Sequence, residues 1–288
     1  MRLRLDLAYE GTDFHGWAAQ PALRTVQGTL EAALTQALRV DSVPVTCAGR
    51  TDTGVHARGQ VVHLDVDEEV LRASAGRSTA PAPQALLRRL NGILPGDVRV
   101  LRAVEAPPGF DARFSAVWRR YAYRIADAPE LVDPLVRRSV LAWPRPLDLD
   151  TMNDAARLLV GENDFAAFCK KREGATTIRT LLELSWARDG QGLAVAHVRA
   201  DAFCHNMVRA LVGCMIAVGE GRREPAWAGE VLRSRQRDGG VSVVHAHGLT
   251  LEEVGYPAAA ELAAQARRAR VVRTLPAQEP EGAETAHG

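Results

Sequence analysis

The sequence has few cysteines, and their spacing excludes the common zinc-binding patterns. There are four in 288 residues, and no two of them stand in the close CxxC arrangement of a structural zinc site. We therefore expect no metal, and we expect the thiols to stay reduced and to pack as small apolar groups. The four are Cys47, Cys169, Cys204 and Cys214.

Long hydrophobic runs are also lacking. No apolar run reaches the ~20 residues that a transmembrane helix needs. The first residues, MRLRLDLAYEG, alternate polar and apolar side chains and contain no apolar region of a secretion signal. With 47% hydrophobic residues the chain can nevertheless bury a large core. We expect a folded, cytoplasmic protein that does not bind a membrane.

Lysine is almost absent, because Lys170 and Lys171 are the only two among 36 Lys and Arg residues, which leaves 34 arginines. The formal net charge is only +1, but arginines and aromatic residues alternate between residues 99 and 124. Arginine binds phosphate well, and such mixtures are typical of nucleic-acid surfaces. A solvated arginine-rich face would explain the same charge. Residues 170–172 allow the same two interpretations.

Hydrophobic periodicity predicts an α+β protein. Strands are expected over 2–11, 43–48, 60–66, 97–106 and 118–127, a hairpin over 177–201, and helices over 25–40, 81–96, 148–161, 202–221 and 224–236. The element order of the first half loosely recurs in the second. We expect two pseudo-repeated αβ halves, 1–114 and 115–257, with a mostly antiparallel mixed sheet, and a disordered tail over 258–288.

One polar loop stands out between two predicted strands. Gly49 and Gly54 bracket the triplet Arg50, Thr51 and Asp52. Glycine on both sides allows a tight turn and a close approach by a ligand, which favours a binding or catalytic site. An ordinary hairpin loop is the alternative, because Asp and Gly are common there.

Arg209 is unusual in its predicted helix, where most neighbours are apolar. A guanidinium in such surroundings requires a partner, and we expect that partner to be Asp52. The pair would keep Asp52 ionised and oriented, as a nucleophile or a base. Alternatively, Arg209 reaches water along the polar side of the helix.

These motifs resemble those of the tRNA pseudouridine synthase A family (TruA). The resemblance is carried by YEGTDFHGW, CAGRTDTGVHARGQVVHL, FDARFSAVWRRYAYRI, FCHNMVRALVG and GLTLEEVGYP, in that order from about Arg2 to Pro257. It implies the pseudouridine synthase fold, and isomerisation of uridine to pseudouridine at positions 38, 39 and 40 of the tRNA anticodon stem-loop. No cofactor would be needed. A homodimer with tRNA as its partner is implied as well.

The same resemblance implies roles for five residues. Asp52 would be the catalytic aspartate, Tyr121 would stack on the target uracil, and Arg209 would pair with Asp52. Leu249 would pack against the base, and Arg50 would help to extrude the nucleotide. The sequence departs from the family pattern at Ala18 and Ala19 and at His245 and His247. These departures affect the expected RNA contacts near Trp17 and the shape of the pocket floor around Leu249, but no catalytic position.

Three other classes remain open from the residues. A tRNA-binding protein without catalysis would keep the basic surface but would not need Asp52. A hydrolase could use Asp52 with His56 or His63, although no nucleophile or metal set accompanies them. Cysteine-based RNA methylation would use Cys47, which lies in an apolar strand without a glycine-rich cofactor loop.

Overall fold

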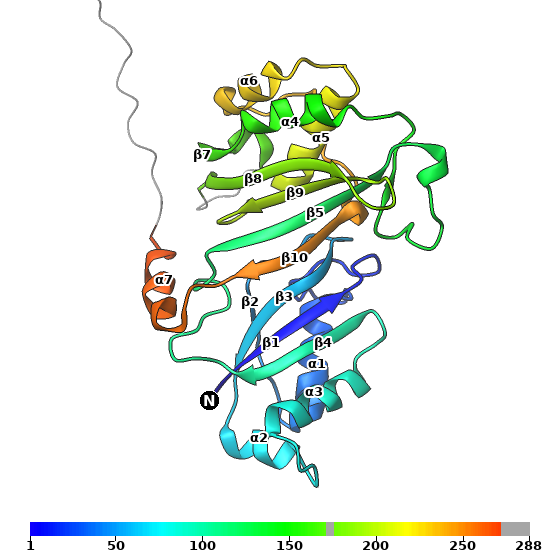
Figure 1. Ribbon diagram of the computed structural model, residues 1–288. Helices are drawn as coiled ribbons and strands as arrows, with labels where there is room; N and C mark the ends of the chain where they lie inside the picture. The colour runs from blue at the N-terminus through cyan, green and yellow to red at the C-terminus, as the bar shows by residue number, and fades with distance from the viewer. Residues whose placement is uncertain (171–175, 272–288) are drawn as a thin grey trace, which may run out of the picture.

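The computed structural model describes residues 1–170 and 176–271, and a single large sheet forms its centre (Figure 1). Within these residues the strand order is β4-β1-β3-β10-β5-β9-β8-β7, with β2 paired to β3 and β6 to β5. The strands are β1 (Arg2–Tyr9), β2 (Thr46–Cys47), β3 (His56–Asp65), β4 (Val98–Glu105), β5 (Trp118–Ala126), β6 (Leu141–Ala142), β7 (Gly161–Asp164), β8 (Ile178–Arg188), β9 (Ala194–Ala200) and β10 (Leu249–Gly255). Two described pairs are parallel, β10 with β3 and β5 with β6, and the others are antiparallel. The predicted α+β class with a mostly antiparallel sheet is confirmed.

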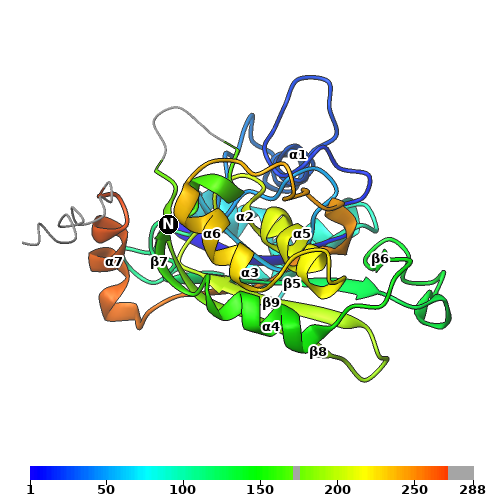
Figure 2. The same ribbon diagram turned by 90° about the horizontal axis from the view of Figure 1, so that it is seen from above.

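Helices pack on both ends of this sheet, as Figures 1 and 2 show. In Figure 1, α1 to α3 lie beside the strands of the first half and α4 to α6 beside those of the second. The helices are α1 (Val26–Leu38), α2 (Glu68–Ser74), α3 (Ala82–Ile93), α4 (Leu149–Arg157), α5 (Met207–Gly219), α6 (Ala226–Ser234) and α7 (Leu262–Arg268). Nowhere in the two described ranges is a helix both long and apolar enough to cross a bilayer.

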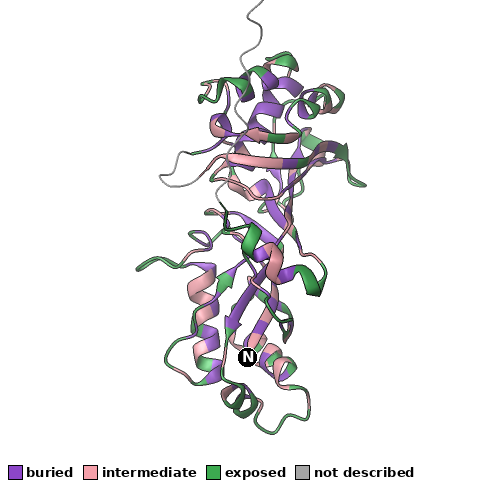
Figure 3. Ribbon diagram, turned by 90° about the vertical axis from the view of Figure 1, so that its left-hand side faces the viewer, coloured by how far each residue is buried: buried purple, intermediate pink, exposed green. Residues whose placement is uncertain are grey.

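The last strand of the sheet joins the two halves. β10 lies between β3 of the first half and β5 of the second, parallel to one and antiparallel to the other. Buried side chains from both halves form one large apolar cluster, and the strands are the main buried part of Figure 3. Strand β10 therefore completes the centre of the sheet, beside β3, the strand that follows the predicted catalytic loop.

Local sequence signals explain α1 well. Thr25 caps the helix by accepting a hydrogen bond from the Gly28 amide, as its position before the periodic run predicts. The buried residues recur at helical spacing and are Val26, Leu30, Ala33, Leu34, Ala37 and Leu38. This helix, the 177–201 hairpin and the cap of α4 by Asp148 confirm the periodicity analysis.

Some expectations about the chain trace were wrong or incomplete. The predicted helix over 202–221 begins only at Met207, and residues 202–206 form an irregular segment. Part of the predicted disordered tail is ordered, because α7 buries Leu262 and Ala266 and the Ser115 hydroxyl donates to the Leu262 carbonyl. Residues 272–288, together with Lys171 and Arg172, lie outside the described residues.

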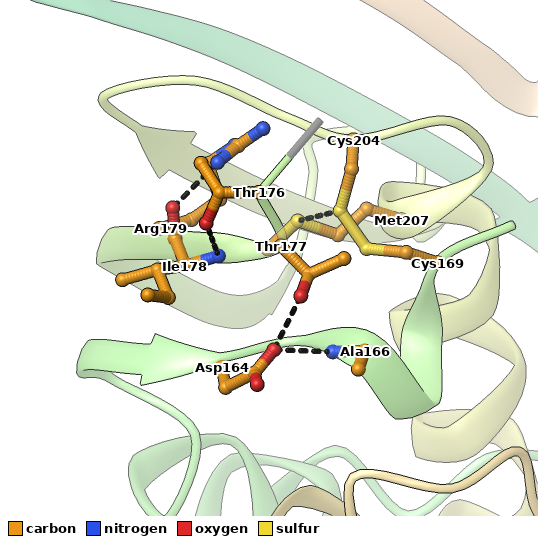
Figure 4. Close-up of a disulfide and its surroundings, with 9 residues drawn as sticks. All are labelled: Asp164, Ala166, Cys169, Thr176, Thr177, Ile178, Arg179, Cys204 and Met207. Atoms are coloured by element: carbon orange, nitrogen blue, oxygen red, sulfur yellow. Dashed lines mark hydrogen bonds between the residues drawn. A yellow bond between two sulfur atoms is a disulfide. The ribbon is translucent and has the colours of Figure 1, made fainter. Parts of the chain in front are cut away.

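The expectation of reduced cysteines was also wrong for Cys169 and Cys204. Cys169 and Cys204 form a disulfide between the connection from β7 to β8 and the segment before α5 (Figure 4). Their Cα atoms are 5.8 Å apart although the residues are separated by 35 positions in the chain. Only the tertiary fold brings them together, so the spacing rules used for zinc sites do not detect the pair. Cys47 and Cys214 are buried free thiols.

Candidate active site

A cavity of about 1060 Å³ lies between the loop from β2 to β3, strand β5 and the start of α5. Its walls also include the loop after β1 and the irregular segment 202–206. The five residues singled out from the sequence all line it: Arg50, Asp52, Tyr121, Arg209 and Leu249. Residues up to 199 positions apart, from Arg50 to Leu249, thus meet in one cavity.

The charges that line this cavity are strongly one-sided. Asp52 is the one carboxylate among the described residues that line it. The arginines along the same walls are Arg50, Arg113, Arg119, Arg179 and Arg209. Such a cavity attracts anions.

The loop that carries Asp52 is fixed on both sides by hydrogen bonds. The Thr51 hydroxyl lies 2.7 Å from the hydroxyl of buried Tyr9, and the Thr51 carbonyl accepts from the Trp17 amide at 3.0 Å. Gln60 donates to the Gly49 carbonyl at 2.8 Å. Hydrogen bonds from Tyr9, Trp17 and Gln60 therefore fix the backbone around Asp52, and Asp52 itself lines the cavity.

The two bracketing glycines differ in their role. Gly54 has φ +79°, in the left-handed region that favours glycine, and its amide donates to the Phe14 carbonyl at 3.4 Å. Gly49 does not have a positive φ. The sequence argument for a special turn thus holds at the second glycine and fails at the first.

The expected pair of Asp52 and Arg209 is not formed in the described part of the chain. Arg209 instead donates from Nε to the Val244 carbonyl at 2.6 Å. Arg209 thus has a backbone carbonyl before β10 as its partner, in place of the carboxylate that the sequence analysis expected. The basic side chain beside Asp52 is His205, with Nε2 3.5 Å from Asp52 Oδ1. His205 belongs to the segment that was predicted to be helical.

Tyr121 forms an aromatic wall of the cavity. Strand β5 places it between Leu251 of β10 and Val198 of β9, and the Phe203 ring stands edge-on to it at 5.2 Å. Burial raises the pKa of its hydroxyl far above the usual range, so the phenol stays protonated at neutral pH. Leu249, the first residue of β10, is 5% exposed and adds an apolar surface.

Arg119 is a structural residue that the sequence analysis placed only within a basic patch. Its guanidinium is buried and donates to the carbonyls of Asp201, Ala48 and Arg113, each at 2.7 Å. Burial lowers the pKa of this group. The residue ties three walls of the cavity together and is not available as a simple phosphate contact. The sequence could have indicated this position, because alternate residues of a strand lie on the same face, and Arg119 therefore shares a face of β5 with Tyr121.

Other arginines of the 99–124 region form ion pairs on the sheet. Arg124 lies 2.7 Å from Glu252, and Arg120 lies 3.0 Å from Glu253, both across the pairing of β5 with β10. The net positive charge that the sequence suggested for this region is therefore partly neutralised by two glutamates of β10. Both interpretations of the region, a nucleic-acid surface and a solvated arginine-rich face, have to take these ion pairs into account.

The histidines considered for a hydrolase stand outside the cavity. His56 accepts from the Gly11 amide at Nδ1 (2.8 Å) and contacts the His247 carbonyl through Nε2 (3.0 Å). His63 accepts from the Ala112 amide at 3.0 Å. Burial lowers the pKa of both rings. Both rings form hydrogen bonds with backbone groups, which argues against either histidine as a general base next to Asp52. Across residues 1–170 and 176–271, no three His, Cys, Asp or Glu side chains cluster as a metal site.

Comparison with known proteins identifies the family. The family profile described as tRNA pseudouridine synthase matches residues 7–115 and 155–257. A tRNA pseudouridine synthase A of Streptomyces griseus subsp. griseus is 61% identical over 278 residues, which cover 96% of this chain and 95% of that protein. The corresponding protein of Frankia casuarinae is 56% identical over 96% of this chain and 97% of its own length. That of Streptomyces avermitilis is 58% identical, with 96% and 95% covered. With its cavity of one acid and five arginines, the chain belongs to the tRNA pseudouridine synthase A family.

Proposed function

We propose that this enzyme converts uridine to pseudouridine at positions 38, 39 and 40 of the tRNA anticodon stem-loop, with Asp52 as the reacting acid. Membership of the family already makes the chain an isomerase that acts on tRNA uridine. One observation carries the finer assignment. The cavity brings a single carboxylate, Asp52, together with Tyr121, Arg209 and Leu249 from distant parts of the chain.

Base flipping fits the dimensions of this cavity. A volume of about 1060 Å³ is slightly larger than that of ordinary ligand sites, which measure roughly 300–1,000 Å³. It can therefore receive a whole nucleotide. Removing a base from an RNA stem costs a few kcal/mol, which stacking and phosphate contacts offset. Tyr121 supplies the ring for stacking, and Arg50 at the exposed rim is placed for the RNA backbone.

The chemistry requires only one acid–base group near the uracil. The bond between N1 and the ribose C1′ breaks, the uracil turns, and C5 bonds to C1′; C5 loses a proton and N1 gains one. Asp52 would attack C6, attack C1′, or remove the ribose 2′ proton. Because the pKa of Tyr121 is raised, we assign stacking to Tyr121 and the proton transfer at C5 to Asp52. No electron or group is exchanged with another molecule, so the proposal needs no cofactor.

The partners follow from the same assignment. We propose that the protein works in the cytoplasm, where tRNA is processed, and as a homodimer that holds one tRNA across both subunits. The family resemblance supports the dimer, and the shape of the anticodon arm would select the neighbouring positions. Size-exclusion chromatography with light scattering tests the dimer: a mass of twice 31.2 kDa is expected, and a monomer at working concentration contradicts it.

Tritium release tests the reaction and the role of Asp52 together. Unmodified tRNA labelled at uridine C5 is incubated with wild type or Asp52→Asn, without added cofactor. Wild type should release tritium, and the variant should be slower by at least ~10³-fold while binding tRNA almost equally, because the two side chains are nearly isosteric. Turnover by Asp52→Asn would refute the role of Asp52. Substrates with U→C at positions 38, 39 and 40, singly and together, test the site: the triple change should abolish release.

A further inference from the structure

We propose that His205 is a positioning residue that orients the Asp52 carboxylate. Its Nε2 lies 3.5 Å from Asp52 Oδ1, and among the described residues it is the basic side chain in contact with this carboxylate. The inference rests on the proposed role of Asp52 as the reacting acid. His205 does not itself have to touch the uracil, since its effect passes through the carboxylate.

The exposure of both side chains explains why such a residue is needed. The side chains of Asp52 and His205 are 35% and 46% exposed. A carboxylate with this freedom samples several rotamers, and each misplacement slows a reaction that depends on alignment. An imidazole 3.5 Å from Oδ1 restricts the rotation of the carboxylate and leaves Oδ2 free to react. A contact at one carboxylate oxygen therefore suits a positioning role better than a bidentate arginine, which would occupy both oxygens of Asp52.

The backbone of His205 is itself anchored. Its carbonyl accepts a hydrogen bond from the Lys170 amide at 3.0 Å, and the preceding Cys204 is linked to Cys169. The next residue, Asn206, has φ +66° and turns the chain into α5. Figure 4 shows how the disulfide joins two segments that are far apart in the sequence. The imidazole is thus presented from a fixed point on the cavity wall.

The segment 203–207 contacts both predicted catalytic side chains. Phe203 packs edge-on against Tyr121, and His205 faces Asp52. The remaining titratable and charged groups on the walls are His15, Tyr121, Cys47 and the five arginines of the cavity, and none of the arginines forms an ion pair with Asp52 among the described residues. His205 is therefore the group whose loss should change the orientation of the carboxylate.

Two substitutions of similar size separate positioning from structure. In His205→Gln the amide nitrogen stands where Nε2 of the imidazole stood and can still donate to Asp52. In His205→Asn the amide is one carbon shorter, corresponds to Nδ1, and falls short of the carboxylate. Steady-state kinetics on anticodon-arm tRNA should give His205→Gln a kcat within about 3-fold of wild type. His205→Asn should lose about 10- to 100-fold in kcat with KM changed less than 3-fold.

Controls make each outcome decisive. His197→Asn, on β9 and outside the cavity, should match wild type. If His205→Asn keeps the wild-type kcat, if its loss appears only in KM, or if Gln is as poor as Asn with equal melting temperatures, the positioning role is wrong. The parallel Asp52→Asn measurement separates the two claims, because turnover by that variant refutes the proposed function, whereas an inactive Asp52→Asn beside a fully active His205→Asn refutes this inference alone.

Discussion

The hydroxyl of Tyr9 lies 2.7 Å from the Thr51 hydroxyl, directly beneath the loop that presents Asp52. Both side chains are buried, and Gln60 donates to the same Tyr9 oxygen at 3.3 Å. The network links β1 and β3 to Thr51, the residue before the proposed catalytic acid Asp52. A loop that is ordinary in composition is thereby given a fixed conformation by hydrogen bonds from the sheet.

Removal of this hydroxyl in Tyr9→Phe should weaken both stability and turnover. The change leaves the buried Thr51 hydroxyl without its partner, which costs about 1–3 kcal/mol of the free energy of unfolding. It also loosens the backbone beside Asp52, so we expect kcat to fall about 10-fold with little change in KM. Urea denaturation and single-turnover kinetics measure the two effects.

Tyr256→Phe is the matched control for this experiment. The Tyr256 hydroxyl donates to the Ala112 carbonyl at 2.7 Å, and the residue does not line the cavity. The same atom is removed from a half-buried tyrosine, so the free energy of unfolding should also fall while kcat stays unchanged. An equal loss of kcat in both variants would show that the effect of Tyr9 is general destabilisation.

The buried ring of His56 predicts a pH dependence of stability. Burial lowers its pKa in the folded protein, while the unfolded chain titrates near the ordinary value of about 6.5. Below that value the unfolded chain binds a proton that the folded chain does not, so the free energy of unfolding should fall as the pH drops from about 6.5 toward 5. The slope is at most about 1.4 kcal/mol per pH unit for each such ring.

Denaturation curves at pH 7.5, 6.5 and 5.5 measure this slope, above the range in which carboxylates titrate. His56→Gln keeps a polar side chain that does not titrate, and its curves should show a smaller slope than wild type. The remaining slope comes from His63 and His247, whose pKa values burial also lowers. Identical slopes in wild type and His56→Gln would mean that the pKa of His56 is the same in the folded and unfolded states, which contradicts the prediction.

Features with a local cause were predictable from the sequence. The α1 boundary follows from the Thr25 cap and the 3.6-residue spacing of its apolar side chains. The conformation at Gly54 follows from a short motif. The gathering of Asp52, Tyr121 and Arg209 in one cavity was predicted through the family resemblance and is confirmed by the structure. Their chemical roles stay predictions.

Features that depend on which distant segments meet were not predictable. Arg209 was assigned a carboxylate because side-chain charges can be read from a sequence, whereas a carbonyl such as that of Val244 cannot. Strand β10 was missed because its place between β3 and β5 is set by the whole sheet. The irregular turn before α5 was read as helix, since apolar spacing does not show where a helix begins.

The disulfide between Cys169 and Cys204 predicts a specific thiol count. Protein purified without reductant should show two reactive thiols in denaturant, those of Cys47 and Cys214, and four after reduction. In Cys169→Ser the count should be three in both conditions. Four thiols in the untreated wild type would show that the bond is not formed.

Reduction should also lower stability and activity to different extents. A bond that closes a loop of 35 residues contributes about 2–4 kcal/mol to the free energy of unfolding. Its loss frees one of the two anchors of the segment carrying His205, while the hydrogen bond from the Lys170 amide remains. We therefore expect reductant to reduce kcat by less than His205→Asn does, and to leave Cys169→Ser unaffected. A reductant effect of equal size on Cys169→Ser would place the cause elsewhere, since that variant has no bond between these two positions to lose.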